Sequence, residues 1–294
     1  MSSKDLMETF KEIRHYLTLV PGVFWLFLFL FVPLAVMAIF SFWSMVEYKL
    51  IPEWTLKNYA AVITSRNGLY IKLLLKSLGM SVAATIASIS MAYPMAYYIS
   101  RYAGKYKYLW INVIIAPYMI SWVITLFGWR TILGYGGLIN FLLMKLGLIS
   151  KPITWLWHNW GAVIFVLTVG WAPWLVLPIF VSLEKIDESL LEAARDMGAS
   201  PMQTFLTVTL PLSIPGLLLA VFFVLIPTFG EFVAPRIAGG TSGAMYGMAI
   251  EDAFIRMANW PFASAMTFLL LAISLVIAII LIRRVGLETL MEAL

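Results

Sequence analysis

The sequence predicts an all-α integral membrane protein with six transmembrane helices, organised as one domain over residues 1–294. The chain is 62% hydrophobic and only 12% charged, with a mean hydropathy of +0.92. A soluble domain is roughly half apolar and about a quarter charged. The apolar residues also gather into six segments that each reach the roughly 20 residues needed to cross a bilayer, which is too long for the strands of a membrane barrel.

The six predicted spans follow one another with no room for a soluble domain between them. They are approximately Val20 to Val46, Ser77 to Ser100, Leu109 to Thr131, Asn159 to Leu183, Leu212 to Ala234, and Phe262 to Ile282. The first is longer than the apolar core of a signal peptide and lacks a small-residue cleavage site, so we expect it to be retained. Prolines inside the spans, such as Pro117, remove backbone hydrogen bonds and predict kinks.

Composition and motifs exclude most catalytic and metal chemistry. The chain has no cysteine, which excludes disulfides and thiolate metal sites, and its two histidines, His15 and His158, are far apart in the sequence. No phosphate-binding G-x-x-x-x-G-K-[ST] loop, G-x-S-x-G elbow or H-E-x-x-H pair occurs. We therefore expect neither a metal, a cofactor nor an enzymatic activity in this chain. Basic residues at membrane edges account for the net charge of +5 without a nucleic-acid partner.

One polar stretch, residues 192–211, interrupts the apolar pattern between the fourth and fifth spans. Before it, Asp187 places negative charge at the start of a short helix, where the helix dipole favours it. Gly198 stands where a C-cap glycine ends that helix. Ser200 and Gln203 then form a capping box for a second short helix. The pattern predicts a helical hairpin at the membrane surface, and a docking surface for a partner explains it better than internal packing does.

The stretch contains Glu192, Ala193 and Ala194, then Gly198, and ends with Leu210 and Pro211. With these residues at these spacings, it resembles the EAA loop of the membrane subunits of binding-protein-dependent ABC importers. Val208 stands where that family has isoleucine most often, which is a mild departure. In the family, this loop is a coupling helix that docks on an ATPase subunit. In this chain, the corresponding loop comprises residues 184–211. The resemblance therefore implies a type I importer transmembrane domain. It assigns ATPase docking to Glu192, Ala193, Ala194, Arg195, Gly198, Leu210 and Pro211.

A candidate substrate pathway contains the one acidic residue within or at the edge of a span, Glu231. A carboxylate at membrane depth is costly and usually faces a polar cavity or a partner. It either contacts a cationic substrate or is paired, for instance with Arg236, or solvated. The aromatic residues Tyr118, Trp122 and Trp129 could hold a cation over their faces, although packing is the simpler explanation for them.

The substrate class is suggested by three patches: residues 230–235, the pair Gly239 and Gly240, and residues 259–265. Together they resemble permeases of the spermidine and putrescine importers. Arg236 departs from this pattern. Its positive charge, if it faced the pathway, would repel a polycation. Related permeases for opines, iron, thiamine or phosphonates look broadly similar and remain alternatives.

The resemblance also implies the setting of the chain. Its partners would be two ATPase subunits that bind ATP and magnesium, a second permease that is often a paralogue, an external solute-binding protein and a small solute. The twenty basic residues divide evenly between the two sides of the membrane, so orientation rests on the EAA-type loop. That loop must face the cytoplasm, which places both termini, including residues 1–19, on the cytoplasmic side of a bacterial inner membrane. An ion-coupled secondary transporter and a membrane scaffold are the alternatives from other classes.

Overall fold

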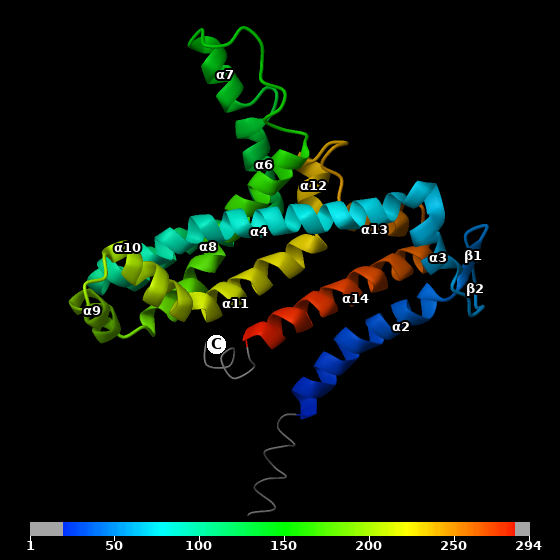
Figure 1. Ribbon diagram of the computed structural model, residues 1–294. Coiled ribbons are helices and arrows are strands. Elements are labelled where there is room, and N and C mark those ends of the chain that lie inside the picture. Colours follow the sequence, from blue (N-terminus) through cyan, green and yellow to red (C-terminus); the bar gives the residue numbers. More distant parts are fainter. Residues whose placement is uncertain (1–19, 286–294) are drawn as a thin grey trace, which may run out of the picture. The chain divides into compact units, whose positions relative to one another are not determined.

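The computed structural model describes residues 20–285 of the chain (Figure 1). The predicted cytoplasmic segment 1–19 lies outside the described residues. Within them, five helices are long and apolar enough to cross a membrane, or six if one bent pair forms a single span. The five are Val20–Ser41, Leu69–Tyr102, Trp160–Glu184, Pro201–Phe229 and Trp260–Arg283. The predicted all-α membrane fold class is confirmed.

The third predicted span, Leu109 to Thr131, is broken rather than straight. Its two parts, Gly104–Met119 and Trp122–Lys145, meet at 86°. Between them, Ile120 and Ser121 adopt extended backbone angles that no helix can continue through. Pro117 contributes to the break because it lacks the N–H that the helix needs. The elements of this region are η3 (Gly104–Tyr106), α5 (Lys107–Ile115), η4 (Ala116–Met119), α6 (Trp122–Leu133) and α7 (Leu138–Lys145).

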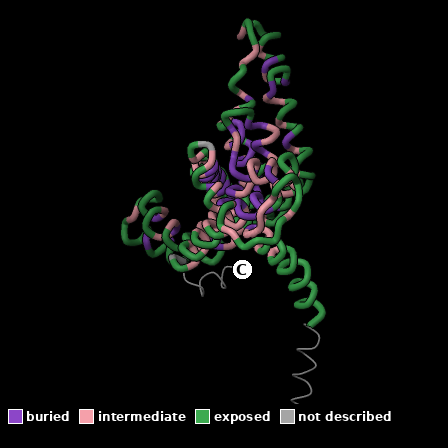
Figure 2. Tube along the Cα trace, turned by 90° about the vertical axis from the view of Figure 1, so that its right-hand side faces the viewer, coloured by how far each residue is buried: buried purple, intermediate pink, exposed green. Residues whose placement is uncertain are grey.

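The described chain forms two compact units, and the larger comprises residues 68–251 and 270–285. Its centre is the packing of three long helices, α4 (Leu69–Tyr102), α8 (Trp160–Glu184) and α11 (Leu210–Phe229). Figure 2 colours the buried residues purple, and many of the buried residues belong to these three helices. One apolar cluster joins Ala92, Ala96, Leu175 and Val224, and a second joins Met80, Leu126, Val163 and Val166.

Small residues allow the long helices to approach one another closely. A Cβ at Gly216 of α11 would lie 2.8 Å from the carbonyl oxygen of Pro178 in α8. The Gly216 N–H instead donates a hydrogen bond to the Ser182 hydroxyl at 3.3 Å. Ser88 of α4 similarly donates to the carbonyl of Thr168 in α8 at 3.3 Å. The apolar face of each helix is therefore matched to its neighbour by the position of its small residues.

Shorter elements complete this unit after the long helices. The helices α9 (Glu188–Asp196) and α10 (Pro201–Thr204), with the π-helix η5 (Phe205–Thr209), lie between α8 and α11. After α11 come α12 (Val233–Ala238) and α13 (Tyr246–Glu251). The Tyr246 N–H donates to the Ser77 hydroxyl at 2.7 Å, which attaches α13 to α4.

The smaller unit comprises residues 20–67, as far as they are described, and 252–269. Its elements are the π-helix η1 (Phe27–Phe31), α2 (Val32–Ser41), β1 (Ser44–Val46), β2 (Lys49–Ile51), α3 (Lys57–Thr64), most of η2 (Ser65–Gly68), η6 (Asp252–Arg256) and the start of α14 (Trp260–Val285). The first span thus ends at Ser41 and not at the predicted Val46. Strands β1 and β2 pair antiparallel and are joined by a turn at Glu47 and Tyr48, which both have positive φ. This turn lacks the Asn-Gly or Asp-Gly pair that usually signals a hairpin.

Candidate functional site

The polar stretch forms a helical hairpin whose first helix, α9, begins as predicted. The Asp187 carboxylate accepts a hydrogen bond from the Ser189 N–H at 3.0 Å. This bond stabilises the ionised form and lowers the pKa of Asp187. Glu188 adds a second negative charge to the first turn, where the helix dipole favours it.

The same helix ends at the predicted glycine. Gly198 has a φ of +86°, a left-handed conformation that glycine adopts at no steric cost. Its N–H donates to the Arg195 carbonyl at 2.8 Å, and the Ala199 N–H donates to the Ala194 carbonyl at 3.0 Å. These two bonds constitute a Schellman motif, which satisfies the last carbonyls of α9 and reverses the chain.

The second helix begins with the predicted capping box, in which Ser200 and Gln203 bond reciprocally to each other's backbone N–H. It does not end before the fifth span, however. Helices α10, η5 and α11 run on as one span, Pro201–Phe229, whereas a separate short helix and a span starting at Leu212 were predicted. The π-helix η5 ends at Thr209, two residues before Pro211, so the missing proline N–H is accommodated by a local change of register.

We call residues 187–204 the docking hairpin. Leu191 and Ala194 are only 4% and 5% exposed, so one face of α9 is anchored in the protein. The predicted docking residues Glu192, Ala193, Arg195, Gly198 and Pro211 are exposed, and Leu210 is half-buried. Met197 is 84% exposed at the tip. Neither Glu192 nor Arg195 forms an ion pair within the described residues, so both charges face outward without an internal partner.

Directly after the docking hairpin, the chain is attached to the core through aromatic residues of α4. The ring of Phe205, at the start of η5, lies edge-on to Tyr93 at 5.8 Å and to Tyr97 at 5.7 Å. The Tyr93 hydroxyl is also hydrogen-bonded to Ser213 in α11, at 2.9 Å. These contacts connect the chain that follows the hairpin to α4 and α11.

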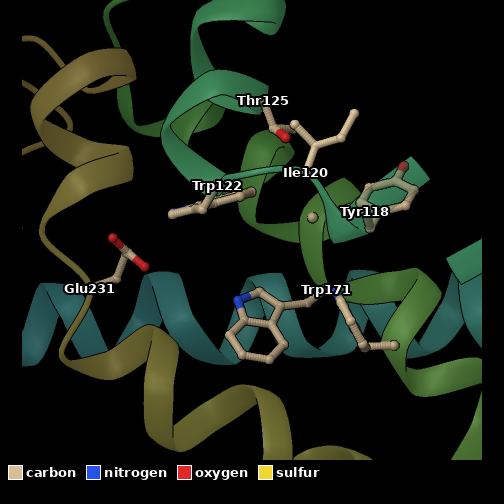
Figure 3. A pocket seen from close by; sticks show the side chains of 8 residues that line it. Tyr118, Ile120, Trp122, Thr125, Trp171 and Glu231 are labelled. Atoms are coloured by element: carbon tan, nitrogen blue, oxygen red, sulfur yellow. The ribbon is translucent and has the colours of Figure 1, made fainter. Parts of the chain in front are cut away.

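A cavity of about 330 Å³ lies at the break in the third span. Its lining comes from η4, the extended break, α6, α8 and the connection between α11 and α12: Tyr118, Ile120, Trp122, Thr125, Gly170, Trp171, Trp174 and Glu231. We call this the aromatic cavity (Figure 3). It unites three of the four predicted pathway residues, Tyr118, Trp122 and Glu231. Irregular backbone at membrane depth is tolerated where it is buried in protein or lines a cavity, as it does here.

The two carboxylate oxygens of Glu231 differ in their hydrogen bonds. Its Oε1 accepts hydrogen bonds from the backbone N–H groups of Phe232, Val233 and Ala234 at 3.1, 2.7 and 3.2 Å. This arrangement caps the start of α12. Its Oε2 accepts no hydrogen bond within the described residues. Figure 3 shows the carboxylate on the same side of the cavity as the rings of Trp122 and Trp171.

Arg236 does not pair with Glu231. Its guanidinium binds the Glu251 carboxylate through Nε at 2.9 Å and through Nη2, and both side chains are about a quarter exposed. A nearby carboxylate thus neutralises the positive charge that seemed to oppose a cationic substrate. Glu231 is consequently the one formally charged side chain in the cavity lining.

Trp122 occupies its place in the cavity because Gly170 has no side chain. A Cβ at Gly170 would lie 2.6 Å from Cη2 of the Trp122 ring. Trp129, the fourth predicted pathway residue, instead packs edge-on against Phe165 at 5.0 Å and does not line this cavity. Sequence reasoning missed Trp171 and Trp174, because a proline-containing span that is apolar on all faces does not reveal which tryptophans face a cavity.

These features define an inner-membrane transport component, and comparison with known families agrees. Residues 20–286 match the family described as "Binding-protein-dependent transport system inner membrane component". The chain belongs to this family and is a multi-pass permease subunit of an ABC importer in the bacterial inner membrane. A solute-binding protein is therefore part of the system in which it acts.

Individual relatives narrow the comparison. The chain is 32% identical over 242 residues to the spermidine/putrescine transport system permease protein PotB of Salmonella typhimurium, covering 82% of this chain and 83% of PotB. It is 31% identical over 249 residues to the inner membrane ABC transporter permease protein YdcU of Escherichia coli, covering 80% of this chain and 77% of YdcU. In fold, it is similar to a chain of a bacterial alginate ABC importer with a TM-score of 0.78 and 18% identity, covering 96% of this chain and 98% of the other.

Proposed function

We propose that this permease subunit carries a polyamine such as spermidine or putrescine, and that the aromatic cavity is a station on its path. The observation that carries this proposal is the charge of the lining: four aromatic side chains and one carboxylate, with no basic residue among the eight. An ammonium group is attracted by aromatic faces and by an unpaired carboxylate oxygen. Relatives that are themselves polyamine permeases support the same substrate class. An anionic phosphonate would find no cation in this lining.

The docking hairpin, on this proposal, binds an ATPase subunit. The exposed charges of α9 and the protruding Met197 offer a surface, while the buried Leu191 and Ala194 attach it to the core. Two ATPase subunits would hold ATP and magnesium and perform all hydrolysis, so this chain would have no enzymatic activity. A second permease, such as a paralogue, would complete the pathway. Because the hairpin meets the ATPase in the cytoplasm, both termini would lie there.

Transport would follow from alternating access. ATP binding closes the ATPase pair and moves the docking hairpin, the helices reorient, and the binding protein releases its ligand into the outward-open pathway. Such a mechanism requires the ATPase and the substrate to bind the two states with different affinities. The attachment of Phe205 to α4 gives the hairpin a physical connection to the helices that would move.

The replacement Glu231→Gln tests the proposal. The glutamine oxygen can still accept the three N–H bonds that cap α12, so the change removes the charge and preserves the local fold. Hydrogen bonds to charged groups contribute about 1.5–3 kcal/mol, so spermidine uptake by the complete importer in proteoliposomes should fall about tenfold or more. The ligand affinity of the binding protein serves as the unaffected control. Unchanged uptake would show that the carboxylate is only a helix cap.

A further inference from the structure

The end of α8 is held by two cations from the turn between α4 and α5. Lys107, the first residue of α5, donates to Glu184 Oε1 at 2.7 Å. Arg101, in the last turn of α4, donates through Nη2 to the Leu183 carbonyl at 3.1 Å. We call these two interactions the α8 clamp. The last carbonyls of a helix carry partial negative charge, so both cations stabilise the end of α8.

The clamp is adjacent to the docking hairpin. Glu184 is the last residue of α8, and Asp187, which caps α9, follows three residues later. The short connection cannot move independently, because Ile186 is 6% exposed and belongs to the same buried cluster as Ile99 and Ile111. Any displacement of α9 is thus applied to the residues that the clamp holds.

The aromatic cavity lies at the far end of the helical segment that begins at Lys107. Helix α5 begins at Lys107, and η4 continues it to Tyr118, which lines the cavity. At about 1.5 Å per residue this helical segment is about 17 Å long. It ends where the backbone becomes extended, at Ile120 and Ser121. A continuous helical segment therefore joins the clamp to the break that lines the aromatic cavity.

The clamp also contains an unused donor. The Nε of Arg101 is buried and has no hydrogen-bond partner in the described part of the chain. Such buried donors are rare because leaving one unsatisfied is costly. A second arrangement, in which the guanidinium shifts along the α8 terminus and Nε gains an acceptor, would account for it.

We propose that Arg101 and Lys107 are positioning residues for transport: the α8 clamp transmits movement of the docking hairpin through α5 to the wall of the aromatic cavity. This inference rests on the proposed docking of the hairpin to an ATPase. It differs from a purely stabilising role, since a partly exposed ion pair (side chains 28% and 32% exposed) contributes little to stability by itself.

Charge reversal and charge exchange test the clamp in the complete importer reconstituted in proteoliposomes. Lys107→Glu places two carboxylates together and should reduce binding-protein-stimulated ATP hydrolysis and spermidine uptake at least fivefold. Basal hydrolysis and co-purification of the ATPase should be unchanged. The double variant Lys107→Glu/Glu184→Lys restores opposite charges and should recover at least half of the stimulation. Lys105→Glu is the matched control, because Lys105 lies two residues away and contacts the Tyr106 ring, with no carboxylate partner among residues 20–285.

The outcomes separate the clamp from the docking proposal. Normal stimulation in Lys107→Glu, or a double variant that assembles yet is no better than the single one, would overturn the clamp. If Lys107→Glu fails to accumulate, Lys107→Met, which removes the charge without repulsion, takes its place and must show the same loss. The docking proposal is tested separately. It would be contradicted if substitutions in the docking hairpin left binding of the ATPase subunit intact, whatever result the clamp variants gave.

Discussion

Replacement of Gly198 separates the internal geometry of the docking hairpin from its contact with a partner. A Cβ added at this position meets no atom within 4 Å, so the chain itself imposes no limit on side-chain size. The φ of +86° imposes a backbone cost on any residue with a Cβ, of about 1–2 kcal/mol. Alanine and tryptophan should therefore strain the hairpin equally, and asparagine, which tolerates this conformation better, should strain it less.

A partner seated on the hairpin changes this expectation. Overpacking at a close contact costs about 1–3 kcal/mol, so Gly198→Trp should reduce stimulated ATP hydrolysis about tenfold below Gly198→Ala. The assay is hydrolysis by the reconstituted importer with saturating binding protein, with membrane insertion checked for each variant. Leu148→Trp places the same tryptophan side chain at a 67% exposed position after α7 and should leave the rate unchanged. Equal losses for Gly198→Ala and Gly198→Trp would refute docking at this surface.

Three further expectations follow from the cavity and the cap. Gly170→Ala places a Cβ against the Trp122 ring, and this overpacking should cost about 1–3 kcal/mol. The variant should have a lower melting temperature and reduced uptake. An unchanged melting temperature would refute the packing argument. Glu251→Gln removes a carboxylate that binds the Arg236 guanidinium and should weaken spermidine uptake, and adding Arg236→Gln should restore it; a double variant as weak as the single one would contradict this reading. The pKa of Asp187 is lowered in the folded chain, so its stabilisation of α9 is present above its ordinary pKa and is lost as pH falls through the lowered value. Amide hydrogen exchange in α9 should therefore become faster in acid. An Asp187→Ala variant should show no such change.

The features that were predictable from the sequence are those set by local chemistry. The Ser200 capping box and the Gly198 turn depend only on residues within a few positions of one another, and both are present as expected. The long spans were equally visible, because hydropathy sums over many residues. The all-α membrane class thus required no knowledge of tertiary contacts.

Features that depend on distant partners could not be predicted in the same way. The pairing of Arg236 with Glu251 joins residues 15 positions apart on two short helices, and no sequence period indicates it. The break at Ile120 and Ser121 follows Pro117, but Pro94 and Pro173 lie inside helices that continue. A proline permits a break, and the surrounding packing decides whether one forms. The hairpin turn at Glu47 and Tyr48 likewise lacks its usual residues.

The central claim is that an ATPase subunit binds the exposed tip of the docking hairpin, and site-specific cross-linking tests it most directly. The chain contains no cysteine, so Met197→Cys introduces a unique thiol at an 84% exposed position. In an importer that still transports, a short bifunctional reagent should join this thiol to the ATPase subunit in high yield, whereas Leu148→Cys should give no such product. An actively transporting complex in which Cys at 197 never reaches the ATPase would contradict the account.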